Sequence, residues 1–116
     1  MINPAYVTAS DALRMVNHYG ILRRMVKAGT IKPRQLSGRD NWYERAPIIE
    51  MKKLIDSTMT MEEIKDLLNC SYVFVKNRIK AGYIVEAKNE AFGKSRRYYK
   101  QGVFDYIEME KNKHIA

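Results

Sequence analysis

The sequence of 116 residues has very little cysteine: Cys70 is the only one, so no disulfide can form within the chain. Nothing therefore suggests an oxidising compartment. No apolar run approaches the roughly 20 residues that a membrane-spanning helix needs, and the N-terminal segment lacks the basic and apolar regions of a signal peptide. We therefore expect a cytoplasmic protein that makes no contact with a membrane.

Catalytic and metal-binding patterns are also missing. The single cysteine and the two histidines do not have the spacing of zinc ligands, and there is no glycine-rich phosphate loop, nucleophile elbow or HExxH string. Glu62 and Glu63 resemble an acid–base pair, but they fall in the first turn of a predicted helix, where a capping role explains them. A chain of this length also leaves little room for a substrate pocket beside its core. We expect no enzymatic activity, no metal and no cofactor.

Positive charge is what the sequence has in excess. Lys and Arg number 21 against 13 Asp and Glu, for a net charge of +8, which favours a polyanionic partner, although a generically basic surface would explain the total equally well. The distribution is more informative, because no acidic residue lies between Asp11 and Asp40 or between Asp66 and Glu86. These two segments contain Arg14, Arg23, Arg24, Lys27, Lys32, Arg34, Arg39, Lys76, Arg78 and Lys80. A binding face requires such segregation of charge.

The two acid-free segments belong to an internal repeat. Residues 8–31 resemble residues 60–84: Lys27-Ala28-Gly29 recurs as Lys80-Ala81-Gly82, and Thr8 corresponds to Thr60. The second copy carries one extra residue, Cys70, which we expect to be a small core residue at a turn. Two copies of a unit of roughly fifty residues would fill the chain. We therefore predict two domains, residues 1–57 and 58–116.

Each copy predicts two short helices separated by a short break, at Asn17 in the first copy and at Asn69-Cys70 in the second. Thr8 and Thr60 are expected to be helix N-caps, and Thr60 forms a capping box with Glu63. The second helix begins at His18 or Ser71 and ends at a glycine, Gly29 or Gly82, where a left-handed residue is favourable. The helical period predicts the following inward residues: Ala12, Met15, Val16, Leu22 and Val26 in the first copy, and Ile64, Leu67, Leu68, Val75 and Ile79 in the second.

After each glycine the period changes from that of a helix to that of a strand. Residues 30–36 with 41–43, and residues 83–87 with 95–99, predict two β-hairpins, the second with its turn at 89–94. A closing helix is expected over 47–55, with Pro47 in first position, and over about 103–110, followed by a frayed end from Lys111; residues 56–59 are expected to be a connector. The fold class is thus α+β, mostly α. The aromatic residues expected in small cores under the hairpins are Trp42, Tyr98, Tyr99 and Tyr106.

Two helices joined by a short turn form the unit that places its second helix in the DNA major groove, because that groove admits one α-helix. Residues 60–84, followed by Arg96-Arg97-Tyr98 and by 103–107, resemble the MerR/excisionase-type winged helix-turn-helix family. The shared pattern is a capped first helix, a serine opening the second, a glycine before the hairpin or wing, and a basic wing strand. The second copy matches over most of its length, whereas the first has His18 in place of the serine. The resemblance implies two tandem winged helix-turn-helix units.

The resemblance also implies a set of DNA contacts. In the second copy these are Ser71, Tyr72, Val73, Lys76, Asn77 and Lys80, and in the first copy His18, Tyr19, Gly20, Arg23, Arg24 and Lys27. Arginine can bond guanine in two places and asparagine adenine, so Arg23, Arg24 and Asn77 are the candidate base readers, while the lysines contact phosphate. On the wings the candidates are Arg34, Arg39, Lys94, Arg96 and Arg97, although basic residues on an edge strand also discourage aggregation.

A full MerR-type regulator carries a long coiled-coil helix and an effector domain, whereas fewer than ten residues follow Ile107. We therefore expect a nucleoid-associated, excisionase-like recombination accessory factor or a small transcriptional repressor. Its partners would be double-stranded DNA, at two sites about 10 bp apart, and a recombinase or another DNA-bound protein. An alternative is a protein-interaction module in which only one unit binds DNA, with the first copy binding protein. RNA binding is a third option, weakened by the lack of an RNP-like aromatic motif, and the oligomeric state stays open.

Overall fold

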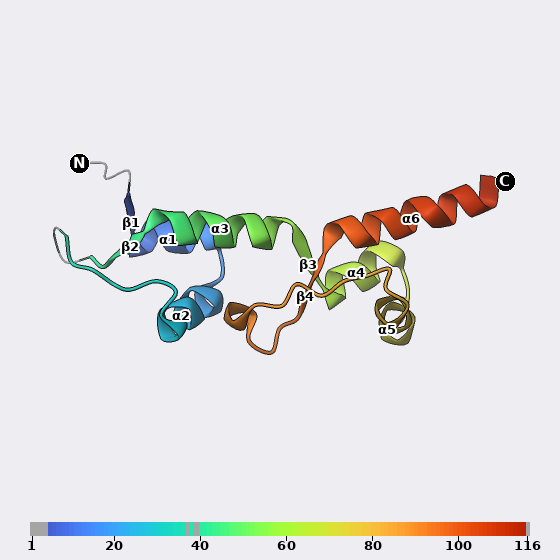
Figure 1. Ribbon diagram of the computed structural model, residues 1–116, viewed down its shortest axis with the longest axis horizontal. Helices are drawn as coiled ribbons and strands as arrows, with labels where there is room; N and C mark the ends of the chain where they lie inside the picture. Colours follow the sequence, from blue (N-terminus) through green and yellow to red (C-terminus); the bar gives the residue numbers. More distant parts are fainter. Residues whose placement is uncertain (1–4, 37, 39, 116) are drawn as a thin grey trace. The chain divides into compact units, whose positions relative to one another are not determined.

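The computed structural model describes residues 5–36, 38 and 40–115. The chain is α+β and mostly helical, with 60% helix and two small antiparallel sheets (Figure 1). The predicted class is therefore confirmed. In this described part of the chain, no helix combines the length and the apolar character needed to cross a bilayer.

The chain forms two compact units. The first contains the described residues up to Asp56 together with Asn89–Gly93, and the second contains Ser57–Lys88 and the described residues from Lys94 onward. In both, the order of the main elements is strand, helix, helix, strand, helix. The repeat in the sequence thus corresponds to a repeat of structure, except that a short segment from the second half of the chain belongs to the first unit.

The first unit contains β1 (Tyr6–Thr8), α1 (Ala9–Val16), α2 (Tyr19–Ala28), β2 (Trp42–Glu44) and α3 (Arg45–Asp56). Thr8 caps α1, since its Oγ1 accepts a hydrogen bond from the backbone N–H of Asp11 at 3.2 Å. Asn17 ends α1 in the left-handed conformation (φ 58°), which asparagine tolerates. Gly29 ends α2 in the same region (φ 80°). The cap and both helix ends are as predicted.

The second unit contains β3 (Thr58–Thr60), α4 (Met61–Leu68), α5 (Tyr72–Lys80), β4 (Arg97–Tyr99) and α6 (Lys100–Ile115). The capping box is confirmed: Thr60 Oγ1 accepts from the backbone N–H of Glu63 at 3.2 Å, and Glu63 Oε1 accepts from that of Thr60 at 3.0 Å. Asn69 (φ 51°) ends α4, and the Ser71 side chain caps α5. The break between the two helices therefore lies where the sequence predicts it.

Strand pairing differs from the prediction. In each unit the strand before the first helix pairs with the strand before the third: β1 is antiparallel to β2, with Val7 opposite Tyr43, and β3 is antiparallel to β4, with Met59 opposite Tyr98. The expected hairpins are reduced to isolated bridges, Arg34 with Trp42 and Glu86 with Tyr98. The expected connector at 56–59 instead supplies most of β3. In the first unit, Pro33 has no N–H with which to extend the hairpin ladder.

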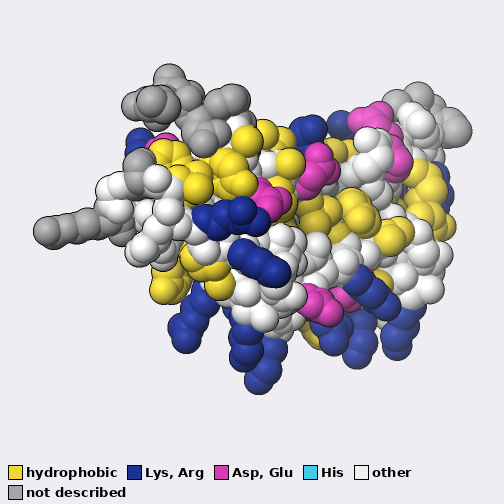
Figure 2. All heavy atoms as spheres, turned by 60° about the vertical axis from the view of Figure 1, so that its left-hand side comes forward, with side chains coloured by type: hydrophobic (Ala, Val, Ile, Leu, Met, Phe, Trp, Pro, Cys, Tyr) yellow, Lys and Arg dark blue, Asp and Glu magenta, His cyan; other side chains and the backbone are white. Residues whose placement is uncertain are grey.

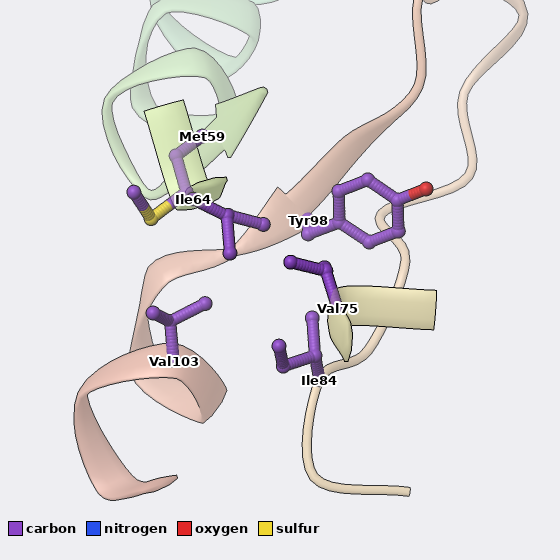
Figure 3. Close-up of a cluster of buried hydrophobic side chains, with 6 residues drawn as sticks. All are labelled: Met59, Ile64, Val75, Ile84, Tyr98 and Val103. Atoms are coloured by element: carbon purple, nitrogen blue, oxygen red, sulfur yellow. The ribbon is translucent and has the colours of Figure 1, made fainter. Parts of the chain in front are cut away.

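The core of the second unit takes buried side chains from each of its helices and strands. Figure 3 shows the side chains converging from β3, α4, α5, β4 and α6 and from the loop after α5: Met59, Ile64, Val75, Ile84, Tyr98 and Val103. Leu68, Ile79 and Cys70 are partly buried against this cluster. The predicted inward position of Leu67 is wrong, because its side chain is 48% exposed. The short α4 buries only Ile64 fully.

The core of the first unit lies between α1, α2 and α3. Ala12, Val16 and Leu22 are buried as predicted. Val26 and Met15 are only half-buried; in α2 the fully covered positions are Ile21, Leu22 and Met25. The buried face of α2 is therefore rotated from the expected one, toward the side covered by Asn89–Gly93.

The segment Asn89–Gly93 completes the first unit. It contains the 3-10 helix η1 (Glu90–Phe92), capped by the side chain of Asn89 and packed against α2 (Figure 1). Ala91 and Phe92 are each 3% exposed, and the Ala91 carbonyl oxygen accepts a hydrogen bond from Arg24 Nε at 2.6 Å. Gly93 adopts φ 59°, and a Cβ there would lie 2.9 Å from the Arg24 side chain. The backbone conformation therefore favours glycine at this position, and any larger residue would also displace the Arg24 side chain.

The closing helices are longer than predicted. Pro47 is the third residue of α3 and not the first; the position suits proline because the first N–H groups of a helix have no partner within it. α6 continues to Ile115 where a frayed end was expected, and pairs such as Glu108 with Lys111 support its last turns. Among the aromatic residues, Tyr98 and Tyr106 are buried as expected, whereas Tyr99 is 40% exposed and Trp42 is half-buried beside the buried Tyr43.

Phe92 should stabilise the first unit although it lies in the second half of the chain. Replacing a buried phenylalanine by alanine costs about 3–5 kcal/mol, so Phe92→Ala should lower the denaturation midpoint of the first unit. Trp42, the only tryptophan, lies in β2, so its fluorescence reports on that unit. Phe104→Ala is the matched control, because Phe104 is 47% exposed on α6. Equal midpoints for the two variants would contradict the assignment of Asn89–Gly93 to the first unit.

The capping box should give the second unit a measurable pH dependence. The hydrogen bond from the Thr60 backbone holds the pKa of Glu63 below its ordinary value of 4.5. A carboxyl with a lowered folded-state pKa stabilises the fold above its ordinary value, and this stabilisation is lost as the pH falls through the folded pKa. Thermal melts followed by circular dichroism should therefore show a smaller loss of stability below pH 4.5 for Glu63→Gln than for the wild type. Glu62→Gln is the matched control, because Glu62 pairs with Lys65 and makes no capping bond; it should not reproduce the effect of Glu63→Gln.

Candidate nucleic-acid interface

α5 presents an open surface opposite its buried side. Val75 is fully buried in the core, whereas Tyr72 and Val73 are 51% and 62% exposed, and Lys76, Asn77 and Lys80 are exposed as well. At about 100° per residue, these five residues lie within an arc of about 140° on the helix. We call this set the exposed arc of α5. All the helical site residues predicted for the second copy lie on it, and Ser71 precedes it as the N-cap.

α2 carries a corresponding surface. Tyr19 is 65% exposed, and Gly20, Arg23 and Lys27 are exposed too, at positions 53 residues before Tyr72, Val73, Lys76 and Lys80. We call these residues the exposed arc of α2. His18 stands at the N-cap position, but its side chain makes no capping hydrogen bond. The histidine thus leaves the helix start less well satisfied than Ser71 does in the second unit.

The cations of the two arcs have no acidic partners. In the part of the chain that the structure describes, Arg23, Lys27, Lys76 and Lys80 take part in no ion pair, and neither helix has an acid in its first turn. The ion pairs within helices lie instead on α1, α3, α4 and α6. Figure 2 shows Lys and Arg side chains, in dark blue, extending from the surface. The arcs therefore keep their full positive charge for an external partner.

Arg24 differs from its predicted role as a base reader. Its Nε donates to the Ala91 carbonyl, and its guanidinium lies 3.4 Å from the position that a Cβ of Gly20 would occupy. The missing side chain of Gly20 thus leaves room for the guanidinium beside the helix. The Arg24 side chain is held against Asn89–Gly93 and is half-buried. It is therefore not open to solvent as the side chain of Arg23 is.

Arg97 is buried, contrary to its predicted place on a DNA-contacting wing. Only 8% of it is exposed, and its guanidinium binds Thr58 on the neighbouring strand: Nε donates to Oγ1 at 2.8 Å and Nη2 to the carbonyl oxygen at 3.2 Å. The arginine thereby joins β4 to β3. The sequence pattern did not predict this burial, because two adjacent basic residues on a strand are expected to be exposed.

Arg96, by contrast, is exposed. Its side chain hydrogen-bonds that of Tyr98, and Tyr72 interacts electrostatically with the same group. Burial raises the pKa of Tyr98, Glu86 raises it further, and Arg96 opposes the shift. Arg96 thus interacts with the buried tyrosine two residues after it.

The other basic residues singled out in the sequence differ in their exposure and in the residues that they contact. Lys94 is exposed. Arg34 is exposed and lies 3.8 Å from Glu44, with its guanidinium 5.9 Å from the ring of Tyr6. Arg39 lies outside the described residues. Arg78, which contributes to the basic character of the second acid-free segment, packs on Phe74 at 4.4 Å and on Tyr106. It therefore lies off the exposed arc of α5.

A shallow groove runs beside the exposed arc of α2. Its volume is about 460 Å³, and its lining consists of Tyr19, Leu22, Arg23, Val26, Lys27, Pro33, Asn41 and Tyr43. The lining is mostly apolar, with two cations and no acidic side chain. Elsewhere, no cluster of three or more His, Cys, Asp or Glu that could hold a metal occurs among the described residues. Burial raises the pKa of Cys70, in keeping with its position against the core.

Arg96 and Arg97, adjacent in the sequence, should have different effects on stability when each is replaced by lysine. Lysine cannot reproduce the two-atom contact that Arg97 makes with Thr58, and a lost hydrogen bond to a charged group costs about 1.5–3 kcal/mol. We therefore expect Arg97→Lys to lower the free energy of unfolding in urea by that amount. Arg96→Lys, the matched control at an exposed position, should change it by less than about 0.5 kcal/mol. Equal effects would show that the contact to Thr58 does not stabilise the sheet.

Comparisons of this chain with protein-family models, with curated proteins and with solved structures gave no match. A function for the chain must therefore be inferred from its own residues: the two exposed arcs, their unpaired cations and the basic residues beside them.

Proposed function

We propose that this chain is a double-stranded DNA-binding protein with two winged helix-turn-helix units, in which α2 and α5 enter major grooves. The observation that carries the proposal is the recurrence, 53 residues apart, of one exposed arc: a tyrosine at its start and cations one and two turns later. A repeat of the fold alone would require only that the buried positions recur. Recurrence on the exposed side is explained by a ligand that both helices contact.

The basic residues of the arcs and Asn77 each have a role in this proposal. Arg23 reads guanine and Asn77 reads adenine, because their side chains match two groups on the edge of those bases. Lys27, Lys76 and Lys80 bind phosphates and so contribute affinity without sequence preference. Lys94 and Arg96 extend the contact from the wing of the second unit, and Arg34 from that of the first. Arg24 and Arg97 are assigned structural roles.

The biological role proposed is that of an excisionase-like recombination accessory factor or a small transcriptional repressor. Both roles need a small basic protein that recognises DNA, and neither needs a catalytic group. They differ in where the target sites lie: beside recombination sites for an accessory factor, and over promoters for a repressor. The recovered target sequence is therefore the observation that would separate them.

The first test is selection of bound duplexes from a random DNA library at near-physiological salt, followed by binding measurements over a salt series. We expect a motif with two half-sites and an affinity that falls steeply with salt. Lys76→Ala should reduce the slope of log affinity against log salt by roughly one unit, since one phosphate contact is removed. Asn77→Ala should relax the preference at one adenine position while leaving the slope nearly unchanged.

Lys53→Ala is the matched control for Lys76→Ala, because Lys53 is an exposed lysine on α3 that belongs to neither arc. Its variant should bind with the wild-type slope. Absence of duplex binding by the folded wild-type protein would refute the proposal. Binding without a recovered motif would restrict it to contacts with the DNA backbone.

A second candidate is a protein-interaction module in which only the second unit binds DNA. Two observations favour it: Arg24 is engaged by Asn89–Gly93, and the apolar groove beside α2 is suited to amphipathic ligands. In this case Arg23→Ala would leave DNA affinity unchanged while Lys76→Ala weakens it. Weakening by both variants would favour DNA contact from both units.

A further inference from the structure

Neither packing nor helix formation explains why the exposed position 73 carries a valine. Its side chain is 62% exposed, the highest value among the large apolar residues described in the second unit, and it lies on the exposed arc, away from Val75. A β-branched residue is also a poorer helix former than alanine. Neither the core nor the helix therefore gains from a valine at this position. An apolar side chain in the middle of a polar and basic surface suggests contact with an apolar group on the ligand.

DNA presents one prominent apolar group in its major groove, the C5-methyl group of thymine. Val73 and Asn77 are four residues apart and therefore neighbours on the surface of α5. Asparagine is the side chain that pairs with adenine through two hydrogen bonds. A valine and an asparagine side by side are thus suited to A·T base pairs, one recognised through its methyl group and one through its adenine.

The first unit lacks this combination. Gly20 occupies the position of Val73, and Arg24, which occupies that of Asn77, bonds the Ala91 carbonyl beside it. The exposed arc of α2 retains Arg23, whose chemistry suits guanine. The two helices should therefore recognise different bases, although they carry the same pattern of tyrosine and cations.

We infer that Val73 is a specificity-determining residue that reads a thymine through its methyl group, and that the half-site bound by α5 contains A·T pairs which the half-site bound by α2 does not require. The inference rests on the proposed function and adds to it the base that one side chain selects. The tandem units then recognise an asymmetric target, so the protein binds it in one orientation.

The test uses the full chain and duplexes of the sequence recovered by selection, in which single thymines are replaced by deoxyuridine. This replacement removes only the methyl group from the groove. At one thymine we expect the wild-type protein to bind roughly fourfold more weakly, the factor that corresponds to burial of one methyl group. Val73→Ala should bind the thymine and uracil duplexes equally well.

Val85→Ala is the matched control, since Val85 is a valine of the same unit, 52% exposed and outside α5. It should keep the fourfold preference of the wild type. Circular dichroism melts should show that both variants fold like the wild type, because both side chains are exposed. Equal effects of the two variants would overturn the role of Val73.

The possible failures can be told apart. If the wild type binds no duplex, both the proposed function and the inference fail. If it selects a motif but tolerates uracil at every thymine, DNA binding holds and methyl recognition by Val73 is refuted. If the preference for thymine persists in Val73→Ala, another residue reads the methyl group and the inference is equally refuted.

Discussion

The short helices α2 and α5 depend on burial of one side against the rest of their unit. Helices of 10 and 9 residues are marginal on their own in water, so they persist because side chains such as Leu22 and Val75 are removed from solvent. That burial also fixes which residues point outward. The arcs with Arg23 and Lys76 are exposed because the opposite sides are held, and they present their side chains from a rigid backbone.

The strand pairs also hold the helices of each unit in place. Each unit joins the residue before its first helix to a strand just before its third helix, so that Thr8 and Thr60 are both strand residues and helix caps. The same few residues therefore set where the first helix begins and which way it runs. In the second unit, Arg97 reinforces the arrangement through Thr58. A cation that seemed suited to DNA thus stabilises the sheet on which the second unit is built.

Local features of the fold could be predicted from the sequence, and distant pairings could not. The capping box at Thr60 and Glu63, the breaks at Asn17 and Asn69 and the glycine after α2 all involve residues within a few positions of one another. The contact between Arg97 and Thr58 spans 39 residues, and that between Arg24 and Ala91 spans 67. Neither leaves a periodic signal. Sequence reasoning therefore located the helices and their exposed sides, but it assigned Arg24 and Arg97 by their charge alone.

The two copies have also diverged in an informative way. The first unit takes up Asn89–Gly93, and this segment engages Arg24 in the space that Gly20 leaves. In the second unit the corresponding positions hold Asn77 and Val73, both of them exposed.

Exposed ion pairs contribute little to stability, so their distribution is not explained by the needs of the fold. Acids accompany lysine or arginine on α1, α3, α4 and α6 and are missing from α2 and α5. In the proposed complex with DNA, an acid on either arc would repel phosphate, so the proposal accounts for its absence in both units. The residues beside the cations differ between the units: Gly20 and Arg24 in the first correspond to Val73 and Asn77 in the second. These positions need not serve the same purpose in the two units.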